Sequence, residues 1–195
     1  MRVESPYLEA RSMIKVAFIG AHSVGKTTLV FEQAARFKRA GINVGVVHEV
    51  ARSCPLPINE GTTLLAQTWI LMTQITREIE EQHRSAELVI TDRSVLDNFA
   101  YLMRAYSKPV PLELIAYLEL WMRTYDLLIK VPIVNAEIQE DGVRSTNAKF
   151  AAEMDQLVDT LLVDSQMGKS VAVHRLSLNR ENWNTEAYQR IKELL

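Results

Sequence analysis

The chain has 195 residues, which is enough for one domain that buries a core without disulfide bonds. Hydrophobic residues make up 48% and charged residues 24%, as in ordinary globular domains, and no stretch is long and apolar enough to cross a bilayer. The formal net charge is only −2, from 22 basic and 24 acidic residues, so the composition gives no support for a broad nucleic-acid surface or a membrane partner.

The N-terminal segment, residues 1–12, contains Pro6 and charges of both signs, so we expect an extension there and a single domain over 13–195. The segment lacks the basic start and apolar core of a signal peptide. Cys54 is the only cysteine and cannot form an internal disulfide. Together these features predict a cytoplasmic protein.

A phosphate-binding loop follows the first predicted strand, an apolar run over 13–19, and precedes a helical pattern over 28–40. The loop reads G-A-H-S-V-G-K-T, and its glycines let backbone N–H groups wrap around phosphate oxygens. Lys26 can reach the β- and γ-phosphates, and the Thr27 hydroxyl can bind Mg²⁺, which predicts ATP and Mg²⁺ as cofactors. We expect His22 to contribute to the backbone conformation of the loop and not to act as an acid or base. The predicted nucleotide-binding residues are Gly20, Ala21, His22, Ser23, Val24, Gly25, Lys26, Thr27 and Thr28.

The second predicted strand, 44–47, is followed by Glu49 and Arg52. Glu49 is placed to accept the proton of an attacking hydroxyl or to order the acceptor, and a solvated strand-end glutamate is the alternative. Arg52 would add positive charge for an anionic acceptor, unless it is a surface arginine.

A long helical pattern covers 62–84. Its spacing predicts a solvent-exposed face that carries Glu78, Glu80 and Glu81. The predicted inner face consists of Leu64, Leu65, Thr68, Trp69, Leu71, Met72, Ile75 and Ile79.

The third predicted strand, 88–91, ends in Asp92 and Arg93. An apolar strand that ends in a carboxylate is the Walker B pattern, in which Asp92 would hold the Mg²⁺ shell. A turn or cap aspartate is the alternative. Arg93 could bind a phosphate or pair with a carboxylate on the side where the phosphate acceptor lies. The alternative is a structural salt bridge.

The second half of the chain continues the alternation. A polar segment after the fourth strand contains Arg144 beside Asp-Gly, and we expect a lid near 136–150 in which Arg144 approaches the γ-phosphate, with a plain surface turn as the alternative. The loop with Arg180 and Trp183 can border the adenine. The remaining predictions are helices over 95–106, 111–125, 150–167 and 185–195, and strands over 127–131 and 171–174.

Strands that alternate with helices predict an α/β, three-layer P-loop NTPase fold with about five parallel strands. Ligands bind such sheets at the carboxyl ends of the strands. We therefore expect the P-loop, Glu49, Asp92 and Arg93 to meet at one edge.

Four segments, in order, resemble the NadR-like AAA-domain P-loop kinases, which include ribosylnicotinamide kinase domains and are distantly similar to deoxynucleoside and thymidylate kinases. They are 20–28, 48–52 (His-Glu-Val-Ala-Arg), 91–97 (Thr-Asp-Arg-Ser-Val-Leu-Asp) and 141–144 (Asp-Gly-Val-Arg). The resemblance implies a nucleoside or nucleotide kinase with Arg93 at the acceptor, Asp97 and Tyr101 near the substrate, and Arg144 in the lid. The predicted lid lacks a dense arginine cluster, with Lys149 where another basic residue is expected, and no nicotinamide-specific feature is found.

The expected function is Mg²⁺·ATP-dependent phosphoryl transfer to a nucleoside or nucleotide, with Lys26, Glu49, Arg93 and Arg144 as catalytic residues. One alternative is a kinase that acts on nucleic acid. Another is a nucleotide-dependent switch or binding module that uses ATP or GTP, although the chain lacks the guanine-reading Asn-Lys-x-Asp pattern. An open pocket beside Glu49 and Arg93 would favour the kinase, and a filled one the switch.

Overall fold

The computed structural model describes residues 13–106, 108–134 and 147–195. The strands are β1 (Ile14–Ile19), β2 (Val44–Val47), β3 (Leu88–Asp92), β4 (Leu127–Lys130) and β5 (Ala172–Arg175). The helices are α1 (Lys26–Arg39), α2 (Leu64–Gln82), α3 (Val95–Ala105), α4 (Leu112–Met122), α5 (Ala148–Asp164), α6 (Gln166–Lys169) and α7 (Trp183–Lys192). Short 3-10 turns are η2 (Val50–Ser53), η3 (Asn59–Gly61) and η4 (Arg180–Asn182).

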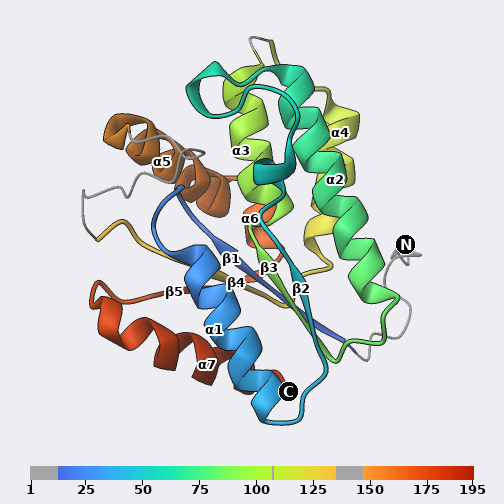
Figure 1. Ribbon diagram of the computed structural model, residues 1–195. Coiled ribbons are helices and arrows are strands. Elements are labelled where there is room, and N and C mark those ends of the chain that lie inside the picture. Colours follow the sequence, from blue (N-terminus) through green and yellow to red (C-terminus); the bar gives the residue numbers. More distant parts are fainter. Residues whose placement is uncertain (1–12, 107, 135–146) are drawn as a thin grey trace.

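The five strands form one parallel sheet in the order β2-β3-β1-β4-β5 (Figure 1). Because every pair is parallel, the carboxyl ends of the strands share one edge. The order brings the end of β1, where the P-loop begins, next to the end of β3. The predicted α/β fold and parallel sheet are confirmed.

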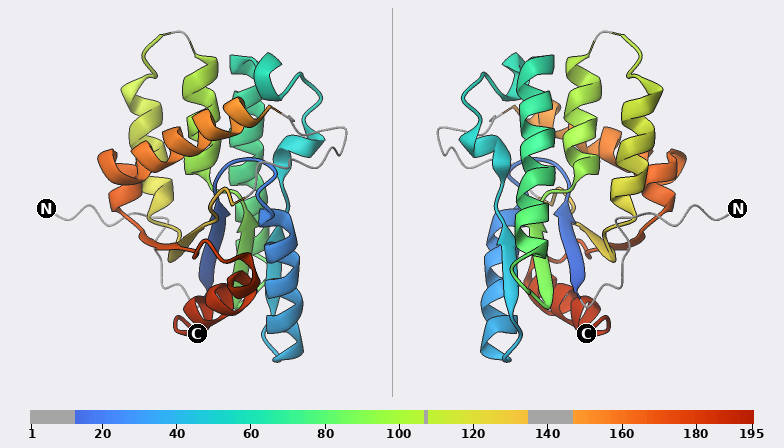
Figure 2. Two further views of the ribbon diagram at one scale, coloured as in Figure 1. Left: turned by 90° about the vertical axis from the view of Figure 1, so that its left-hand side faces the viewer. Right: turned by 90° about the vertical axis from the view of Figure 1, so that its right-hand side faces the viewer.

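Helices cover both faces of the sheet, because successive strand side chains point to opposite sides. Val16 and Phe18 of β1 pack with α1 and α7, whereas Ala17 and Ile19 pack with α2 to α6. Figure 2 shows α5 crossing α3 on the second of these faces. No helix within the described ranges has the length and apolarity needed to cross a membrane.

The buried face of α2 differs from the predicted one. Leu65 and Met72 are 67% and 41% exposed, whereas Glu78, expected in solvent, is fully buried. The reason lies outside the helix, because Lys15 of β1 brings its Nζ to 2.7 Å from Glu78 Oε2 and so allows the carboxylate to be buried. The residues that face inward are Ala66, Gln67, Ile70, Leu71, Gln74, Ile75 and Glu78.

The single helix predicted over 150–167 is two helices, because the chain leaves the helical conformation at Ser165, with ψ at 154°. The Ser165 hydroxyl donates to the Leu161 carbonyl at 2.5 Å and accepts from the Gly168 amide at 3.2 Å. It therefore caps the end of α5 and the start of α6.

Gly20 marks the sharp turn from β1 into the P-loop. Its φ is 131°, and a Cβ added there would lie 2.7 Å from the Val131 carbonyl oxygen. We expect Gly20→Ala to lower the free energy of unfolding by about 3 kcal/mol, from backbone strain and steric overlap together. Gly41 also has a positive φ, 89°, but nothing lies within 4 Å of its added Cβ. Gly41→Ala should therefore lower the free energy of unfolding by only about 1 kcal/mol. Urea unfolding of both variants measures these losses, and equal losses of stability in the two would contradict the steric role of Gly20.

Candidate functional site

The P-loop runs from the end of β1 into the first two residues of α1, Lys26 and Thr27. Ser23 and Gly25 have φ values of 62° and 101°, which curl the backbone. Lys26 is buried, and its Nζ donates to the Gly20 carbonyl at 2.9 Å and to the Ala21 carbonyl. Burial and, next, the charge of Arg93 lower the pKa of Lys26 to about 8. The ammonium group therefore stays charged at neutral pH and donates to neutral carbonyl oxygens. A charged phosphate oxygen is a stronger acceptor than a neutral carbonyl, so a bound phosphate would replace these contacts.

Thr27 and Asp92 lie together at the ends of the P-loop and of β3. The Thr27 hydroxyl donates to Asp92 Oδ2 at 2.5 Å, which directs its lone pairs away from the carboxylate. Asp92 Oδ1 is buried and has no hydrogen-bond partner among the described residues, and burial raises the pKa of this carboxyl. No cluster of three or more His, Cys, Asp or Glu suited to a metal exists in the described parts of the chain.

This pair fits Mg²⁺ that is held mainly by nucleotide phosphates and water, because such sites use only one or two protein groups. Thr27 would supply a hydroxyl ligand, and Asp92 would bind the metal's water shell. Bound Mg²⁺ would neutralise phosphate charge. The unpartnered Asp92 Oδ1 is the observation that supports the fit.

Asp92→Asn should raise the Mg²⁺ concentration needed for half-maximal activity by about tenfold, because a neutral amide orders the metal's water shell less well than a carboxylate. The measurement is a Mg²⁺ titration at saturating nucleotide. Asp164→Asn, a change at the exposed end of α5, is the matched control. An unchanged titration for Asp92→Asn would make this residue a strand-end cap without a metal role.

Glu49 and Arg93 meet at the same edge, as their positions after β2 and within the β3–α3 turn predict. Arg93 donates from Nε and Nη2 to Glu49 Oε1 at 3.1 and 2.9 Å, and both side chains are buried. Arg52 donates from Nε to the other Glu49 oxygen at 3.0 Å. One carboxylate is thus shared by two guanidinium groups, which leaves the cluster with an excess positive charge.

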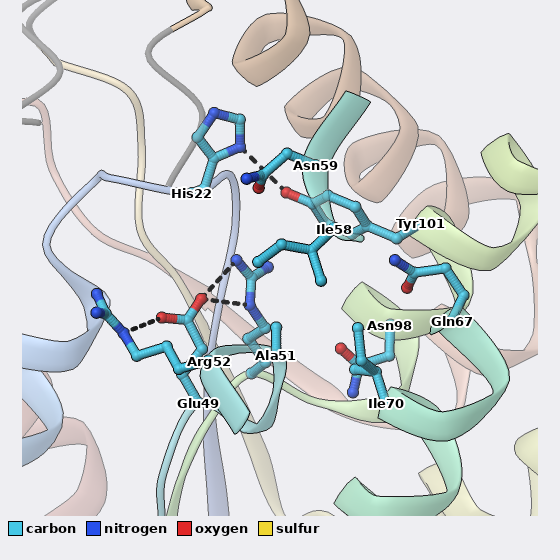
Figure 3. A pocket seen from close by; sticks show the side chains of 11 residues that line it. His22, Glu49, Ala51, Arg52, Ile58, Asn59, Gln67, Ile70, Asn98 and Tyr101 are labelled. Atoms are coloured by element: carbon cyan, nitrogen blue, oxygen red, sulfur yellow. Dashed lines mark hydrogen bonds and ion pairs between the residues drawn. The ribbon is translucent and has the colours of Figure 1, made fainter. Parts of the chain in front are cut away.

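A narrow cavity opens beside this cluster. Figure 3 shows Glu49 and Arg52 on one side of it and Gln67 and Asn98 on the other. Two buried donor atoms of its lining, Arg93 Nη1 and Asn98 Nδ2, have no partner among the described residues. The full lining is His22, Glu49, Ala51, Arg52, Ile58, Asn59, Gln67, Ile70, Arg93, Asn98 and Tyr101.

His22 of the P-loop and Tyr101 of α3 line the cavity together. The Tyr101 hydroxyl lies 3.2 Å from His22 Nδ1, and the two side chains point toward each other in Figure 3. Phe150 of α5 packs against His22, with 5.3 Å between the two ring centroids. Burial, then Arg93 and Lys26, lower the pKa of His22 to about 4, so the ring is neutral at neutral pH. The predicted backbone role for His22 was therefore incomplete, since its side chain also lines the site.

Asp97, which the family resemblance implies near the substrate, is not among the residues that line the cavity. Its Oδ1 accepts the Gly20 amide at 2.9 Å, and its Oδ2 accepts the Ser94 amide and hydroxyl at 3.0 and 2.9 Å. Both oxygens are thus engaged inside the protein, and the residue is fully buried. Asp97 caps α3 and holds the start of the P-loop. The Ser-x-x-Asp spacing, a capping-box signature, was the signal in the sequence that indicated this role.

Two further residues hold the loop, and only one had been singled out. Asp155 of α5 accepts the Ala21 amide at 3.3 Å and Lys130 Nζ at 2.5 Å, contacts that no local pattern indicates. Arg180 lies over Gly25, with Nη2 3.4 Å from where a Cβ would be. The loop before α7 therefore lies against the P-loop. Its place beside the adenine stays a prediction. Arg144 lies outside the described residues, and Lys149 is exposed in the first turn of α5.

Comparison with known proteins adds a family to this geometry. Residues 15–185 match the family model described as an AAA domain. The match spans the P-loop, the Glu49–Arg93 pair and the Arg180 loop. No curated protein matches the chain.

Proposed function

Because the chain belongs to the AAA-domain family of P-loop NTPases, we propose that it transfers the γ-phosphoryl group of ATP to a hydroxyl group of a nucleoside or nucleotide. One observation carries the proposal. A cavity that contains a buried arginine–carboxylate pair opens beside the P-loop. A nucleotide switch has no need for such an acceptor site, whereas a phosphotransferase must place a second substrate in line with the γ-phosphate.

In this proposal Glu49 accepts the proton of the acceptor hydroxyl, while the acceptor oxygen attacks the γ-phosphorus. The bond from that phosphorus to the β,γ-bridging oxygen breaks, ADP leaves, and the proton stays on Glu49. Lys26 and Arg93 stabilise the charge that develops on the transferred group and on the leaving oxygen. Arg93 Nη1 has no hydrogen-bond partner among the described residues and is available for this purpose, while Nε and Nη2 hold Glu49 in place.

The acceptor chemistry follows from the cavity walls. Arg93 Nη1 and Asn98 Nδ2 have no partner in the part of the chain that the structure describes, so an acceptor needs oxygen or ring-nitrogen acceptors at those positions. Ile58 and Ile70 supply apolar surface, and Tyr101 supplies an aromatic ring. A sugar with hydroxyl groups joined to a planar base has both features. The resemblance to ribosylnicotinamide kinases supports the same class of acceptor.

The experiment that tests the proposal is a transfer screen with γ-labelled ATP against nucleosides, nucleoside monophosphates, nicotinamide riboside and DNA ends. We expect label on a nucleoside or nucleotide. Transfer to DNA alone would favour a nucleic-acid kinase. Release of label only as free phosphate, at the same rate with every compound, would favour the nucleotide-dependent switch and contradict the proposal.

A further inference from the structure

Arg93 has an unusual backbone conformation, with φ at 85°, in the left-handed region that long side chains avoid. Such a conformation costs about 1–3 kcal/mol and persists only where its surroundings fix it. Here the Arg93 amide donates to the Phe18 carbonyl at 3.0 Å. The Arg93 carbonyl accepts from the Thr91 hydroxyl at 2.7 Å and from Gln74 Nε2 at 3.3 Å. The structure therefore holds this peptide from several sides.

Gln74 connects Arg93 to a buried carboxylate. Its Nε2 also donates to Glu78 Oε1 at 2.9 Å, and the glutamine is fully buried. Since both partners, a carboxylate and a carbonyl, can only accept, the amide nitrogen must face them.

Glu78 is the centre of this network. Its Oε2 accepts from Lys15 Nζ at 2.7 Å and from Trp121 Nε1 at 2.9 Å. Its Oε1 accepts from the Tyr125 hydroxyl at 2.5 Å as well as from Gln74. All of these contacts are fully enclosed in the core.

Tyr125 carries the network to the other side of Arg93. Its hydroxyl donates to Glu78 and accepts the Val95 amide at 3.1 Å. Val95 is the first residue of α3 and follows Arg93 by two positions. Glu78 is thus connected to the Arg93 carbonyl through Gln74 and to the Val95 amide through Tyr125. These two hydrogen-bond chains fix the turn that contains Arg93 on both sides.

Stability alone gives no reason for this arrangement. A buried ion pair such as Lys15–Glu78 is often no more stabilising than apolar side chains of the same volume, because both charges must leave water. A network that fixes one backbone conformation has a different benefit, since it pre-sets the position of a side chain that acts elsewhere.

We infer that Glu78, with Gln74 and Tyr125, is a positioning network that holds Arg93 in its left-handed conformation and so aims the guanidinium at Glu49 and the acceptor cavity. The inference rests on the proposed function for its kinetic consequence only. The three residues act through Arg93 and do not line the cavity themselves.

The test uses Gln74→Met and Tyr125→Phe, which keep the approximate side-chain size. Gln74→Met removes the hydrogen bonds to Glu78 and to the Arg93 carbonyl, and Tyr125→Phe removes those to Glu78 and from the Val95 amide. Gln33→Met is the matched control, because Gln33 is also a fully buried helical glutamine that donates to a backbone carbonyl, that of Asn184 at 2.9 Å, in the interface of α1 with α7. Circular dichroism establishes that each variant is folded.

The first readout is the NMR signal of the Arg93 Nε–H group, assigned by its loss in Arg93→Lys. We expect the signal to shift and to exchange faster with water in Gln74→Met and Tyr125→Phe, but not in Gln33→Met. The second readout is transfer to the best acceptor, which should fall about tenfold at unchanged nucleotide affinity. An unchanged Arg93 signal in both variants would overturn the inference. If wild-type protein transfers phosphate to no acceptor, the proposed function fails, and the NMR result still upholds or overturns the positioning role.

Discussion

Replacement of Lys26 by alanine should lower phosphoryl transfer by about a thousandfold or more, since loss of a positioned charge at a transferring phosphoryl group has effects of this size. Lys26 is buried at the P-loop, and among the described residues its Nζ donates to the carbonyls of Gly20 and Ala21. These contacts lie within the loop itself, so the apolar core is untouched and the variant should fold.

The measurement is single-turnover transfer from γ-labelled ATP, with the circular dichroism spectrum as a check of the fold. Lys38→Ala provides a matched control, because Lys38 lies in the last turn of the same helix, far along α1 from the loop. The control should transfer at the wild-type rate. Purified, folded Lys26→Ala protein with wild-type turnover would contradict the assignment of the P-loop.

The sequence was sufficient to predict the fold and the edge of the sheet that carries the site. Apolar strands that alternate with helical patterns dictate a parallel sheet, and a parallel sheet puts Thr27, Glu49 and Asp92 at one edge. The structure confirms that Thr27 contacts Asp92 and that Arg93 contacts Glu49. These predictions succeeded because local periodicity and chain direction decide them.

The predictions that failed depend on partners far away in the sequence. Glu78 was expected in solvent because polarity was read along one helix, whereas its partner Lys15 lies 63 positions earlier, in β1. The contact of Asp97 with the P-loop was missed for the same reason, since its partner Gly20 lies 77 positions away. A sequence pattern shows which residues are charged, but the pairing of buried charges is decided by tertiary packing.

Substitutions at the acceptor side should separate nucleotide binding from turnover. We expect Glu49→Gln and Arg93→Ala each to reduce transfer by about a hundredfold or more, the scale for losing a positioned base or a charge clamp. The two residues form a buried pair beside the cavity, whereas the described residues nearest the nucleotide side are those of the P-loop and Arg180. ATP affinity should therefore stay within a few-fold of wild type.

The matched controls are Glu80→Gln and Arg77→Ala, which break an exposed ion pair of 2.7 Å on the outer face of α2. An exposed pair contributes little to stability, so both controls should bind and transfer as the wild type does. They show whether the loss of any glutamate–arginine pair, at the site or away from it, affects ATP binding or transfer.

The most direct measurement of the central claim is ATP affinity by calorimetry alongside transfer to the best acceptor, for wild type, Glu49→Gln and Arg93→Ala. If the cavity is the acceptor site of a phosphotransferase, nucleotide affinity remains near that of wild type in both variants while transfer falls about a hundredfold. If both variants transfer normally, or if ATP affinity falls as steeply as turnover, the cavity is not an acceptor site and a nucleotide-binding module explains the chain better.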